Sequence, residues 1–314
     1  MRKFLGIDGG GTSTRAIVLD ESGRVTGQGK AGPSNYHNVG MATAVANIAA
    51  AAAMAGVANG ADAAFLGLAG VRSRIDETRL ASAAEAAGLA APGGVTVAND
   101  LHNALAGGLN GGAGVALIAG TGSNCLGMNE SGRHFMCGGW GWLLDDRGAG
   151  FGLATDGLRA VSRAADGRAA ATALLDAAVA HFEMTEPFEL LERLYAHGWK
   201  PGEVAAFAPT VMRLAAGGDA TALGVLRTGA EALAELVATT ARALDFQAAP
   251  KVVLLGGCLR SDAHYRGMVE DAIRKALPGA AITEPMFDTA YGAALNALRR
   301  AGIHPLPRIV FPNH

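Results

Sequence analysis

The sequence predicts a two-lobed α/β protein, and three observations support that fold class. The chain has 314 residues, and at about 100 to 200 residues per domain this length favours two lobes over one. Segments typical of strands alternate with segments typical of helices. A strand-turn-strand segment near the N-terminus also recurs in the second half. We therefore expect two related α/β lobes, each with its own hydrophobic core.

The composition is that of a compact globular protein. Hydrophobic residues make up 50% of the chain and charged residues 17%, so large cores can be buried and no signature of disorder is present. The formal net charge of -2 provides no strong positive field for nucleic acid or an anionic membrane. The apolar run after Lys3 is too short for a signal peptide, and the stretch 44–58 is shorter than the roughly 20 residues that span a bilayer. We expect a cytoplasmic protein without nucleic-acid or membrane partners.

The three cysteines favour a reducing compartment. Cys125, Cys137 and Cys258 are too few and too scattered for a disulfide framework or a CxxC zinc site. Cys125 and Cys137 can meet across a hairpin, so a disulfide between them stays open, although thiols are what the cytosol favours.

The first lobe is predicted to begin with three strands joined by tight turns. Glycine-bearing turns separate its first apolar segments, and an alanine-rich helix follows. Strands that alternate with helices then imply a layered lobe with a partly parallel sheet. The predicted elements are strands over 4–8, 15–20 and 24–29, a helix over 43–58, a strand over 64–69, a helix over 74–87 and a strand over 95–98.

The second lobe is predicted to contain a helical insertion. It opens with a strand over 115–119 and becomes mainly helical after Gly148, with apolar residues at helical spacing over 219–246. A strand over 251–255 and helices over 262–276 and 289–301 complete it. We place the boundary so that residues 1–111 form the N-terminal lobe and 112–314 the C-terminal lobe, with the last helix able to pack back on the first.

An internal repeat relates the two lobes. When the sequence is shifted by 109 positions, Gly11-Thr12 falls on Gly120-Thr121 and the segment 21–24 falls on 130–133, without a gap. Six of fourteen positions are then identical, and Glu, Ser and Arg match as well as glycine. We interpret this match as a structural duplication. The alternative is two similar hairpin turns that arose by chance, since turns reuse the same residue types.

The first copy of the repeat is a candidate phosphate-binding loop. Successive glycines let backbone N–H groups approach a phosphate, and threonine hydroxyls add donors. A carboxylate at the end of the preceding strand, Asp8, is a candidate ligand for Mg²⁺ bound to phosphate oxygens. The alternative for the loop is a tight hairpin without a ligand. The residues concerned are Gly9, Gly10, Gly11, Thr12 and Thr14.

The second copy again places glycines beside hydroxyls at a strand turn. Its residues are Gly120, Thr121, Gly122 and Ser123, and Leu117 stands where the first copy has Asp8. Two such loops could hold one polyphosphate between two lobes, with the metal on one side only. No Gly-Lys-Ser/Thr follows either loop and each leads into a strand, which excludes a Walker A loop and a Rossmann fingerprint.

Three segments resemble the motifs of the actin-like ATPase superfamily. Residues 7–12 are similar to its first phosphate motif and residues 119–123 to its second. Residues 252–257, which end in Gly256 and Gly257, resemble the motif on which the adenosine rests. The resemblance implies a ribonuclease H-like fold with ATP and Mg²⁺ as cofactors.

Within that superfamily the chain resembles the N-acetylglucosamine kinases and their BadF/BadG/BcrA/BcrD relatives. The matching residues are Asn99-Asp100, the segment 120–124 and Cys137-Gly138-Gly139-Trp140-Gly141-Trp142. The resemblance covers nearly the whole chain, although 160–245 carries no recognisable motif. It implies ATP-dependent phosphorylation of a small-molecule amino sugar, with N-acetylglucosamine and its 6-hydroxyl as first choice.

Asp100 is the candidate catalytic base of this reaction. It follows a predicted strand, so its carboxylate can accept the proton of a sugar hydroxyl at the edge of the sheet. The alternative is an Asn-Asp helix cap ahead of Leu101. By the same resemblance Asn35 would contact sugar hydroxyls, and a turn asparagine is the alternative there.

The rest of the sugar pocket is also assigned by resemblance. The residues implied are Asn124, Gly139, Trp140 and Asp146, with Ser123 beside them. Trp140 and Trp142 could instead belong to the core, an interpretation that we favour for Trp142. Around Asp146 the chain departs from the family pattern, because Asp145 replaces glycine, Arg147 replaces glutamate and Ala149 replaces serine. The identity of the sugar is therefore open.

Several other functions stay open at this point. The nearest alternatives are a glucosamine kinase and an N-acetylmuramic acid kinase. An ATPase activator of a 2-hydroxyacyl-CoA dehydratase shares similar phosphate loops, and a nucleotide-binding scaffold or sugar sensor would need no catalysis. A homodimer is expected only at the level of the family.

Overall fold

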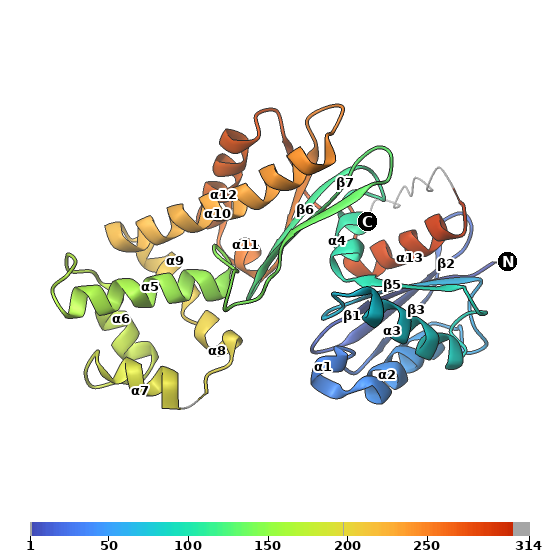
Figure 1. The fold of residues 1–314 in the computed structure, drawn as a ribbon, viewed down its shortest axis with the longest axis horizontal. Helices are drawn as coiled ribbons and strands as arrows, with labels where there is room; N and C mark the ends of the chain where they lie inside the picture. Colours follow the sequence, from blue (N-terminus) through green and yellow to red (C-terminus); the bar gives the residue numbers. More distant parts are fainter. Residues whose placement is uncertain (1, 197, 304–314) are drawn as a thin grey trace, which may run out of the picture. The chain divides into compact units, whose positions relative to one another are not determined.

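The computed structural model describes residues 2–196 and 198–303, which form two compact units (Figure 1). Unit 1 combines the N-terminal part of the chain, up to Ala113, with the C-terminal part from Glu284. Unit 2 is Gly114–Thr283. The chain therefore leaves the first unit, builds the second and returns to the first with its last described helix.

Unit 1 contains one five-stranded sheet and helices on both of its faces. The helices α2 and α3 pack on one face, and α13 packs on the other beside α4. Its elements are β1 (Phe4–Gly9), β2 (Thr14–Leu19), β3 (Val25–Ala31), α1 (Tyr36–Val39), α2 (Met41–Met54), β4 (Ala63–Leu68), α3 (Arg74–Ala86), β5 (Val95–Asn99), α4 (Leu101–Gly108) and α13 (Thr289–Arg300).

Unit 2 contains a second five-stranded sheet and most of the helices. The 25-residue helix α10 packs on β6, β7 and β8. Its elements are β6 (Gly114–Ala119), β7 (Ser123–Met128), β8 (His134–Gly138), α5 (Gly150–Ala165), α6 (Leu174–His181), α7 (Glu189–Ala196), α8 (Pro201–Ala205), α9 (Ala208–Ala216), α10 (Ala220–Leu244), β9 (Lys251–Leu255), α11 (Gly257–Ser261), α12 (Ala263–Ala276) and β10 (Ala281–Thr283).

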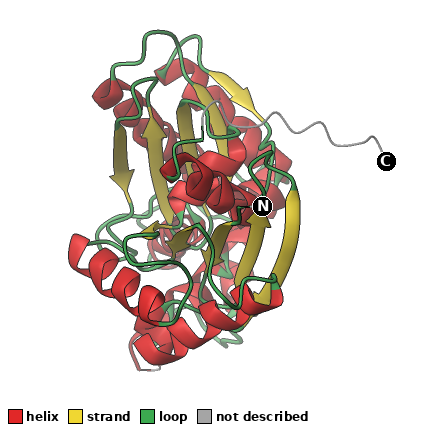
Figure 2. Cartoon of the chain, turned by 90° about the vertical axis from the view of Figure 1, so that its right-hand side faces the viewer, coloured by secondary structure: helices red, strands yellow, loops and turns green. Residues whose placement is uncertain are grey.

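The two sheets, whose strands are drawn in yellow in Figure 2, have the same topology. The first has the order β3-β2-β1-β4-β5, and the second has β8-β7-β6-β9-β10, with the strands in matching roles. In both, the first three strands pair antiparallel and the last two add in parallel. The prediction of duplicated α/β lobes with a helical insertion in the second is confirmed.

The repeat extends to the hydrogen bonds of the turn between the second and third strands. In unit 1, Oδ1 of Asp20 accepts hydrogen bonds from the N–H and hydroxyl of Ser22 and from the N–H of Arg24. In unit 2, Oδ1 of Asn129 accepts the same three hydrogen bonds from Ser131 and Arg133. Asn129 lies 109 positions after Asp20, so the duplication is structural as well as sequential.

Alternation along β1 explains how unit 1 is layered. Leu5 and Ile7 point into the core shared with α2, whereas Phe4 points into the core shared with α13. Gly6 lies on the α13 side, where a Cβ atom would be only 2.0 Å from the backbone nitrogen of Ala294. The absence of a side chain at Gly6 therefore lets α13 lie directly on the strand.

Local patterns predicted some elements closely and missed others. The predicted strand 95–98 and helix 74–87 each agree with the observed bounds to within one residue. The four-residue helix α1 and the three-residue strand β10 were not predicted, because such short segments lack a period that local sequence can reveal. Among the described residues, no helix is both long and apolar enough to cross a membrane.

Candidate functional site

The carboxyl ends of three parallel strands bring the candidate residues of unit 1 to one edge of its sheet. Strands β1, β4 and β5 are parallel neighbours, with Gly9 opposite Leu68 and Leu68 opposite Asn99. Asp8 therefore lies near the end of one strand, and Asp100 follows the end of another. This edge is where ligands bind in open α/β sheets.

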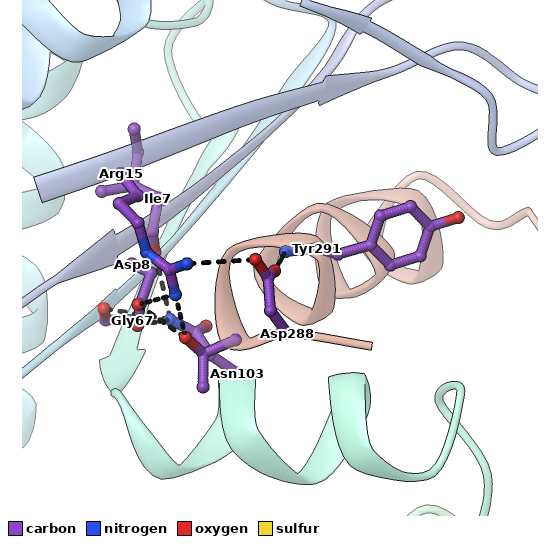
Figure 3. Close-up of polar contacts among 8 residues, drawn as sticks. Ile7, Asp8, Arg15, Gly67, Asn103, Asp288 and Tyr291 are labelled. Carbon is purple, nitrogen blue, oxygen red and sulfur yellow. Dashed lines mark hydrogen bonds and ion pairs between the residues drawn. The ribbon is translucent and has the colours of Figure 1, made fainter. Parts of the chain in front are cut away.

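The Asp8 carboxylate is held by three side chains (Figure 3). Its Oδ2 atom accepts a hydrogen bond from Nη2 of Arg15 at 2.9 Å and from the Thr289 hydroxyl at 2.6 Å. Its Oδ1 atom accepts one from Nδ2 of Asn103 at 3.1 Å. Arg15 lies directly across the hairpin from Asp8. The carboxylate is therefore fixed in orientation and paired with a positive charge.

Asp100 has the environment of a general base. It precedes α4, but its side chain makes no capping hydrogen bond, so the helix-cap alternative does not account for it. Burial, followed by the negative charge of Asp8, raises the pKa of Asp100 to about 6, and the backbone N–H groups of Asp100 and Leu101, followed by the charge of Arg72, oppose this shift more weakly. A carboxylate with a pKa close to neutral can both accept a proton and release it at physiological pH.

The loop that carries Asn35 is joined to the first glycine loop. The carbonyl of Gly10 accepts hydrogen bonds from the N–H groups of Ser34 at 3.0 Å and Asn35 at 3.1 Å. The Asn35 side chain accepts the N–H of His37 and caps the short helix α1. A Cβ atom at Gly9 would lie 2.2 Å from the Ser34 hydroxyl oxygen, so the two segments are in close contact.

The hydroxyls of the first loop have different roles. Thr12 is exposed, and no described group forms a hydrogen bond with its hydroxyl. Thr14 is fully buried, and its hydroxyl donates to the carbonyl of Gly32 at 2.7 Å. The turn itself closes through the N–H of Gly10 and the carbonyl of Ser13. Thr12 is therefore available to a ligand, whereas the hydroxyl of Thr14 maintains the fold of the loop.

The second glycine loop rests on the N-terminus of α5. The carbonyl of Gly120 accepts the N–H of Gly150 at 2.8 Å, and the carbonyl of Thr121 accepts the N–H of Phe151 at 2.9 Å. Thr121 is exposed, like Thr12 at the equivalent position of the repeat. The two loops thus present the same hydroxyl, each supported by a different segment.

Asp146 lies against the second loop. Its Oδ1 atom accepts the N–H of Ser123 at 2.7 Å, and a Cβ atom at Gly122 would lie 2.7 Å from both carboxylate oxygens. Asp146 is buried and has a positive φ of 68°. The hydroxyl oxygen of Ser123 is also buried and has no hydrogen-bond partner among the described residues.

The predicted adenosine motif lies beside the second loop in unit 2. Strand β9 is parallel to β6, with Leu255 opposite Ile118, so Gly256 emerges next to Ala119. Gly256 has a φ of 101°, and a Cβ atom there would lie 2.2 Å from the carbonyl oxygen of Ala119. Gly257 then begins α11. The structure therefore brings Gly256 and Gly257 together with Gly120.

The tryptophan-containing segment lies at the end of β8. Asn124 faces Gly139, where a Cβ atom would lie 2.3 Å from the amide nitrogen of Asn124. Trp140 is 73% exposed and Trp142 is 49% exposed, so the interpretation of Trp142 as a core residue is wrong. The ring of Trp142 instead covers Phe151 at a centroid distance of 5.4 Å.

The three departures from the family pattern have separate environments. Asp145 lies near Gly138, because a Cβ atom at Gly138 would lie 3.5 Å from Oδ2 of Asp145. Arg147 is exposed, and none of the described carboxylates pairs with its guanidinium group. Ala149 is fully buried and precedes α5. Asp145 and Arg147 both change the charge of the segment, and of the two Arg147 is the more exposed.

The thiols are free. Cys125 and Cys137 lie directly opposite each other on β7 and β8, as the hairpin suggested, but no disulfide joins them. Burial raises the pKa of Cys125 to about 12, so this thiol is protonated at neutral pH.

Three residues around Asp8 were not identified from the sequence. Arg15 could have been found, because a hairpin closed by Gly9 and Thr14 places it opposite Asp8. Asn103 lies three residues after Asp100, on the first turn of α4. Thr289 is 281 residues away from Asp8 in the sequence, and nothing local signals their contact.

The residues around Asp8 fit Mg²⁺ through one oxygen atom. Mg²⁺ keeps several water ligands and uses one or two carboxylates together with phosphate oxygens. Oδ2 of Asp8 already has two donors, whereas Oδ1 has one and retains acceptor capacity. Within residues 2–196 and 198–303, no cluster of three His, Cys, Asp or Glu side chains offers an all-protein metal site.

The chain belongs to the BadF/BadG/BcrA/BcrD ATPase family, whose model matches residues 5–297. This match spans both units and all of the candidate residues described above. Family membership confirms the resemblance drawn from the motifs and implies the use of ATP.

Characterised relatives match over nearly the full length. The chain is 29% identical to an N-acetyl-D-glucosamine kinase of Dictyostelium discoideum, covering 94% of this chain and 97% of that protein. It is 27% identical to an N-acetylmuramic acid/N-acetylglucosamine kinase of Clostridium acetobutylicum, covering 95% and 98%.

Solved structures show the same fold. A protein from Chromobacterium violaceum, provisionally described as an N-acetylglucosamine kinase, has a TM-score of 0.71 at 28% identity, covering 95% of this chain and 99% of that one. A ROK family glucokinase from Streptomyces griseus has a TM-score of 0.53 at 19% identity, covering 94% and 98%, and supports the fold alone.

Proposed function

We propose that the protein is an ATP-dependent amino sugar kinase. The observation that carries this proposal is the position and chemistry of Asp100 at the edge of the first sheet. Its carboxylate does not cap α4, and burial together with the negative charge of Asp8 raises its pKa. The names of the relatives, which all specify amino sugar kinases, support the same class of acceptor.

In the proposed reaction Asp100 accepts the proton of the sugar hydroxyl. The hydroxyl oxygen forms a bond to the γ-phosphorus of ATP, the bond from that phosphorus to the β–γ bridging oxygen breaks, and ADP leaves with the electron pair. Asn35, whose loop is joined to the first glycine loop, would orient the sugar. General-base catalysis of this kind typically contributes about 10²- to 10⁴-fold in rate.

The two glycine loops are the proposed phosphate-binding elements. In each, an exposed threonine, Thr12 or Thr121, can donate to phosphate oxygens. Gly256 and Gly257 would support the adenosine. When Mg²⁺ is bound, it neutralises charge on the phosphate oxygens, and Asp8 Oδ1 is the protein atom that would hold it or one of its water ligands.

The proposed substrate is N-acetylglucosamine, phosphorylated at its 6-hydroxyl. Asn124, Gly139 and Trp140 would line the sugar pocket, with the buried Ser123 and Asp146 beneath it. Asp146 would act at least partly through the loop, since its carboxylate accepts the Ser123 N–H. Glucosamine and N-acetylmuramic acid are the rival acceptors, because relatives named for each are similar to this chain.

A coupled ADP-release assay across a panel of sugars tests the proposal. N-acetylglucosamine should give the highest kcat/KM, with ADP release dependent on both sugar and enzyme. A higher kcat/KM for glucosamine or N-acetylmuramic acid would change the proposed substrate and keep the protein an amino sugar kinase. ATP turnover that no sugar stimulates would reject the kinase assignment, and the absence of any ATP turnover across the panel would favour the scaffold or sensor.

Two rival roles receive less support. A dehydratase activator that holds an iron-sulfur cluster between subunits needs accessible cysteines, but Cys125 and Cys258 are buried within unit 2 and Cys137 is only partly exposed. A cytoplasmic location and a homodimer stay predictions, which fractionation and analytical ultracentrifugation would test.

A further inference from the structure

The last described helix of the chain contributes a side chain to the first glycine hairpin. Helix α13 begins at Thr289, and the Thr289 hydroxyl donates to Oδ2 of Asp8 at 2.6 Å. The same hydroxyl oxygen accepts a hydrogen bond from Nη2 of Arg15, also at 2.6 Å. Thr289 therefore bridges the acid of the hairpin and the arginine that pairs with it.

Helix α13 is fixed in place on both sides of Thr289. Asp288, the N-cap residue, accepts the N–H of Tyr291 with Oδ1 and the Nη1 group of Arg15 with Oδ2, at 2.8 and 3.0 Å. Tyr291 is buried, and its hydroxyl donates to the carbonyl of Gly23 at 2.9 Å. The helix start is thus anchored to β2 through Arg15 and Asp288, as Figure 3 shows, and to the turn after β2 through Tyr291.

Close packing leaves the first turn of α13 little freedom to move. A Cβ atom at Gly292 would lie 2.1 Å from the carbonyl oxygen of Asn103, and one at Gly107 would lie 2.4 Å from that of Asp288. The backbones of α4 and α13 are therefore in direct contact. The Asn103 amide reaches from α4 to Ile7, Asp8 and Gly67, which gives Asp8 its third donor.

We propose that Thr289 is a positioning residue for phosphoryl transfer. It fixes the Asp8 carboxylate so that Oδ2 faces Arg15 and Oδ1 keeps acceptor capacity for Mg²⁺ or one of its water ligands. The inference rests on the proposed function. Thr289 acts through Asp8 and contacts neither nucleotide nor sugar.

Apart from Thr289, the Asp8 carboxylate has two side-chain donors, Arg15 on Oδ2 and Asn103 on Oδ1. Arg15 is 39% exposed in its side chain and is shared with Asp288, so its position depends on α13 as well. Without the hydroxyl, Oδ2 keeps one donor, and the carboxylate can rotate toward Arg15. A hydrogen bond to a charged group contributes enough to change a rate about tenfold when it is lost.

The test compares Thr289→Val, which removes the hydroxyl at nearly constant shape, with Thr289→Ser, which retains it. Thr78→Val is the matched control, because Thr78 also donates its hydroxyl within unit 1, to the carbonyl of Arg74 on α3. We expect Thr289→Val to lower kcat about tenfold with the sugar KM unchanged. Thr289→Ser and Thr78→Val should stay within about twofold of the wild type.

A binding measurement separates this inference from the proposed function. Calorimetric titration with ADP, with and without Mg²⁺, gives the gain in affinity that Mg²⁺ produces. Thr289→Val should reduce that gain about fivefold, and Thr289→Ser should preserve it. If the wild type phosphorylates no sugar, the kinase proposal fails, yet this titration still decides the role of Thr289.

Two results would overturn the inference. One is an unchanged kcat and an unchanged Mg²⁺ gain in Thr289→Val. The other is a common loss in Thr289→Val and Thr289→Ser together with a higher sugar KM and a lower Tm, because that pattern marks a packing role only.

Discussion

The hairpins β1–β2 and β6–β7 share a backbone but differ in the chemistry they carry. Both are antiparallel pairs with an exposed threonine at the turn, and both lead into a third strand through the same three hydrogen bonds. The first holds a carboxylate at Asp8, whereas the second has the fully buried Leu117 at the equivalent position. The two hairpins therefore match in backbone and in the exposed threonine, and they differ in the carboxylate, which only the first one carries.

The supports of the two hairpins differ in the same way. The first is held by residues distant in sequence, namely Asn103 and Thr289. The second receives its acid from Asp146, only 23 residues after Ser123. The two loops are therefore supported by residues that do not correspond to each other in the repeat.

The largest expected effect comes from the acid that follows β5 in unit 1. Asp100 follows β5, and the corresponding strand of unit 2, β10, is followed by Glu284. Asp100→Asn should lower kcat about 10³-fold, because the base is lost, while the affinity for ADP stays within twofold. Steady-state kinetics and calorimetry measure the two quantities.

Glu284→Gln is the matched control for that change. It removes an exposed carboxylate from the corresponding place in the second sheet and should leave kcat unchanged. An Asp100→Asn variant that keeps its turnover would remove Asp100 from the mechanism.

The second prediction concerns packing on the first strand of each sheet. Gly6 of β1 corresponds to Val115 of β6 under the shift of 109. Gly6→Ala would place a methyl group 2.0 Å from the backbone of α13 and should lower the free energy of unfolding by about 3 kcal/mol. Val115→Ala only removes methyl groups from a filled core and should cost about 1 to 2 kcal/mol. Urea unfolding of the two variants compares them, and equal costs would contradict the layering described here.

The third prediction is a pH dependence that belongs to unit 1. Because burial and Asp8 raise the pKa of Asp100 to about 6, the fraction of ionised base falls below that pH. We expect kcat/KM at pH 5 to be about tenfold lower than at pH 7. The raised pKa also means that Asp100 lowers stability above pH 6, since ionisation favours the unfolded chain. The Tm of Asp100→Asn at pH 8 should accordingly be no lower than that of the wild type.

The smallest expected effect is a difference in pH dependence between the turn at Asp20 and the matching turn at Asn129. Burial opposes ionisation of Asp20, but hydrogen bonds from Ser22 and Arg24 outweigh it and lower the pKa of Asp20. Its stabilising effect is therefore present at neutral pH and lost as the pH falls through that lowered pKa. Asp20→Ala and Asn129→Ala should each cost about 1 to 2 kcal/mol at pH 7.

At acidic pH the stability costs of Asp20→Ala and Asn129→Ala should then differ. At pH 3 the cost of Asp20→Ala should shrink, whereas the cost of Asn129→Ala should stay, because an amide does not titrate. Hydrogen exchange at the amides of Arg24 and Arg133 measures each turn locally, and parallel behaviour of the two would contradict the assignment.

Local sequence predicted the features that depend on neighbouring residues. The repeat of Gly11-Thr12 as Gly120-Thr121 predicted two matching hairpins, and the shared sheet order confirmed them. The hydrogen-bond match of Asp20 with Asn129 was missed, because the two letters differ although both side chains offer the same acceptor.

Tertiary contacts account for what the sequence left hidden. In the sequence, Thr14 has the same hydroxyl as Thr12 and lies in the same loop. Only the structure shows that the Thr14 hydroxyl donates to the carbonyl of Gly32. Thr289 carries no local pattern at all, since its role depends on the return of α13 to unit 1. Trp142 looked like a core residue because tryptophan is usually buried, but its neighbours leave it half exposed.

Phosphorus-31 NMR of a mixture of the protein, MgATP and N-acetylglucosamine tests the central claim most directly. The account predicts a new sugar 6-phosphate resonance that grows as the γ-phosphate signal decays, with the wild type and not with Asp100→Asn. Loss of the γ-phosphate signal to inorganic phosphate alone, with this sugar and with glucosamine and N-acetylmuramic acid, would contradict it.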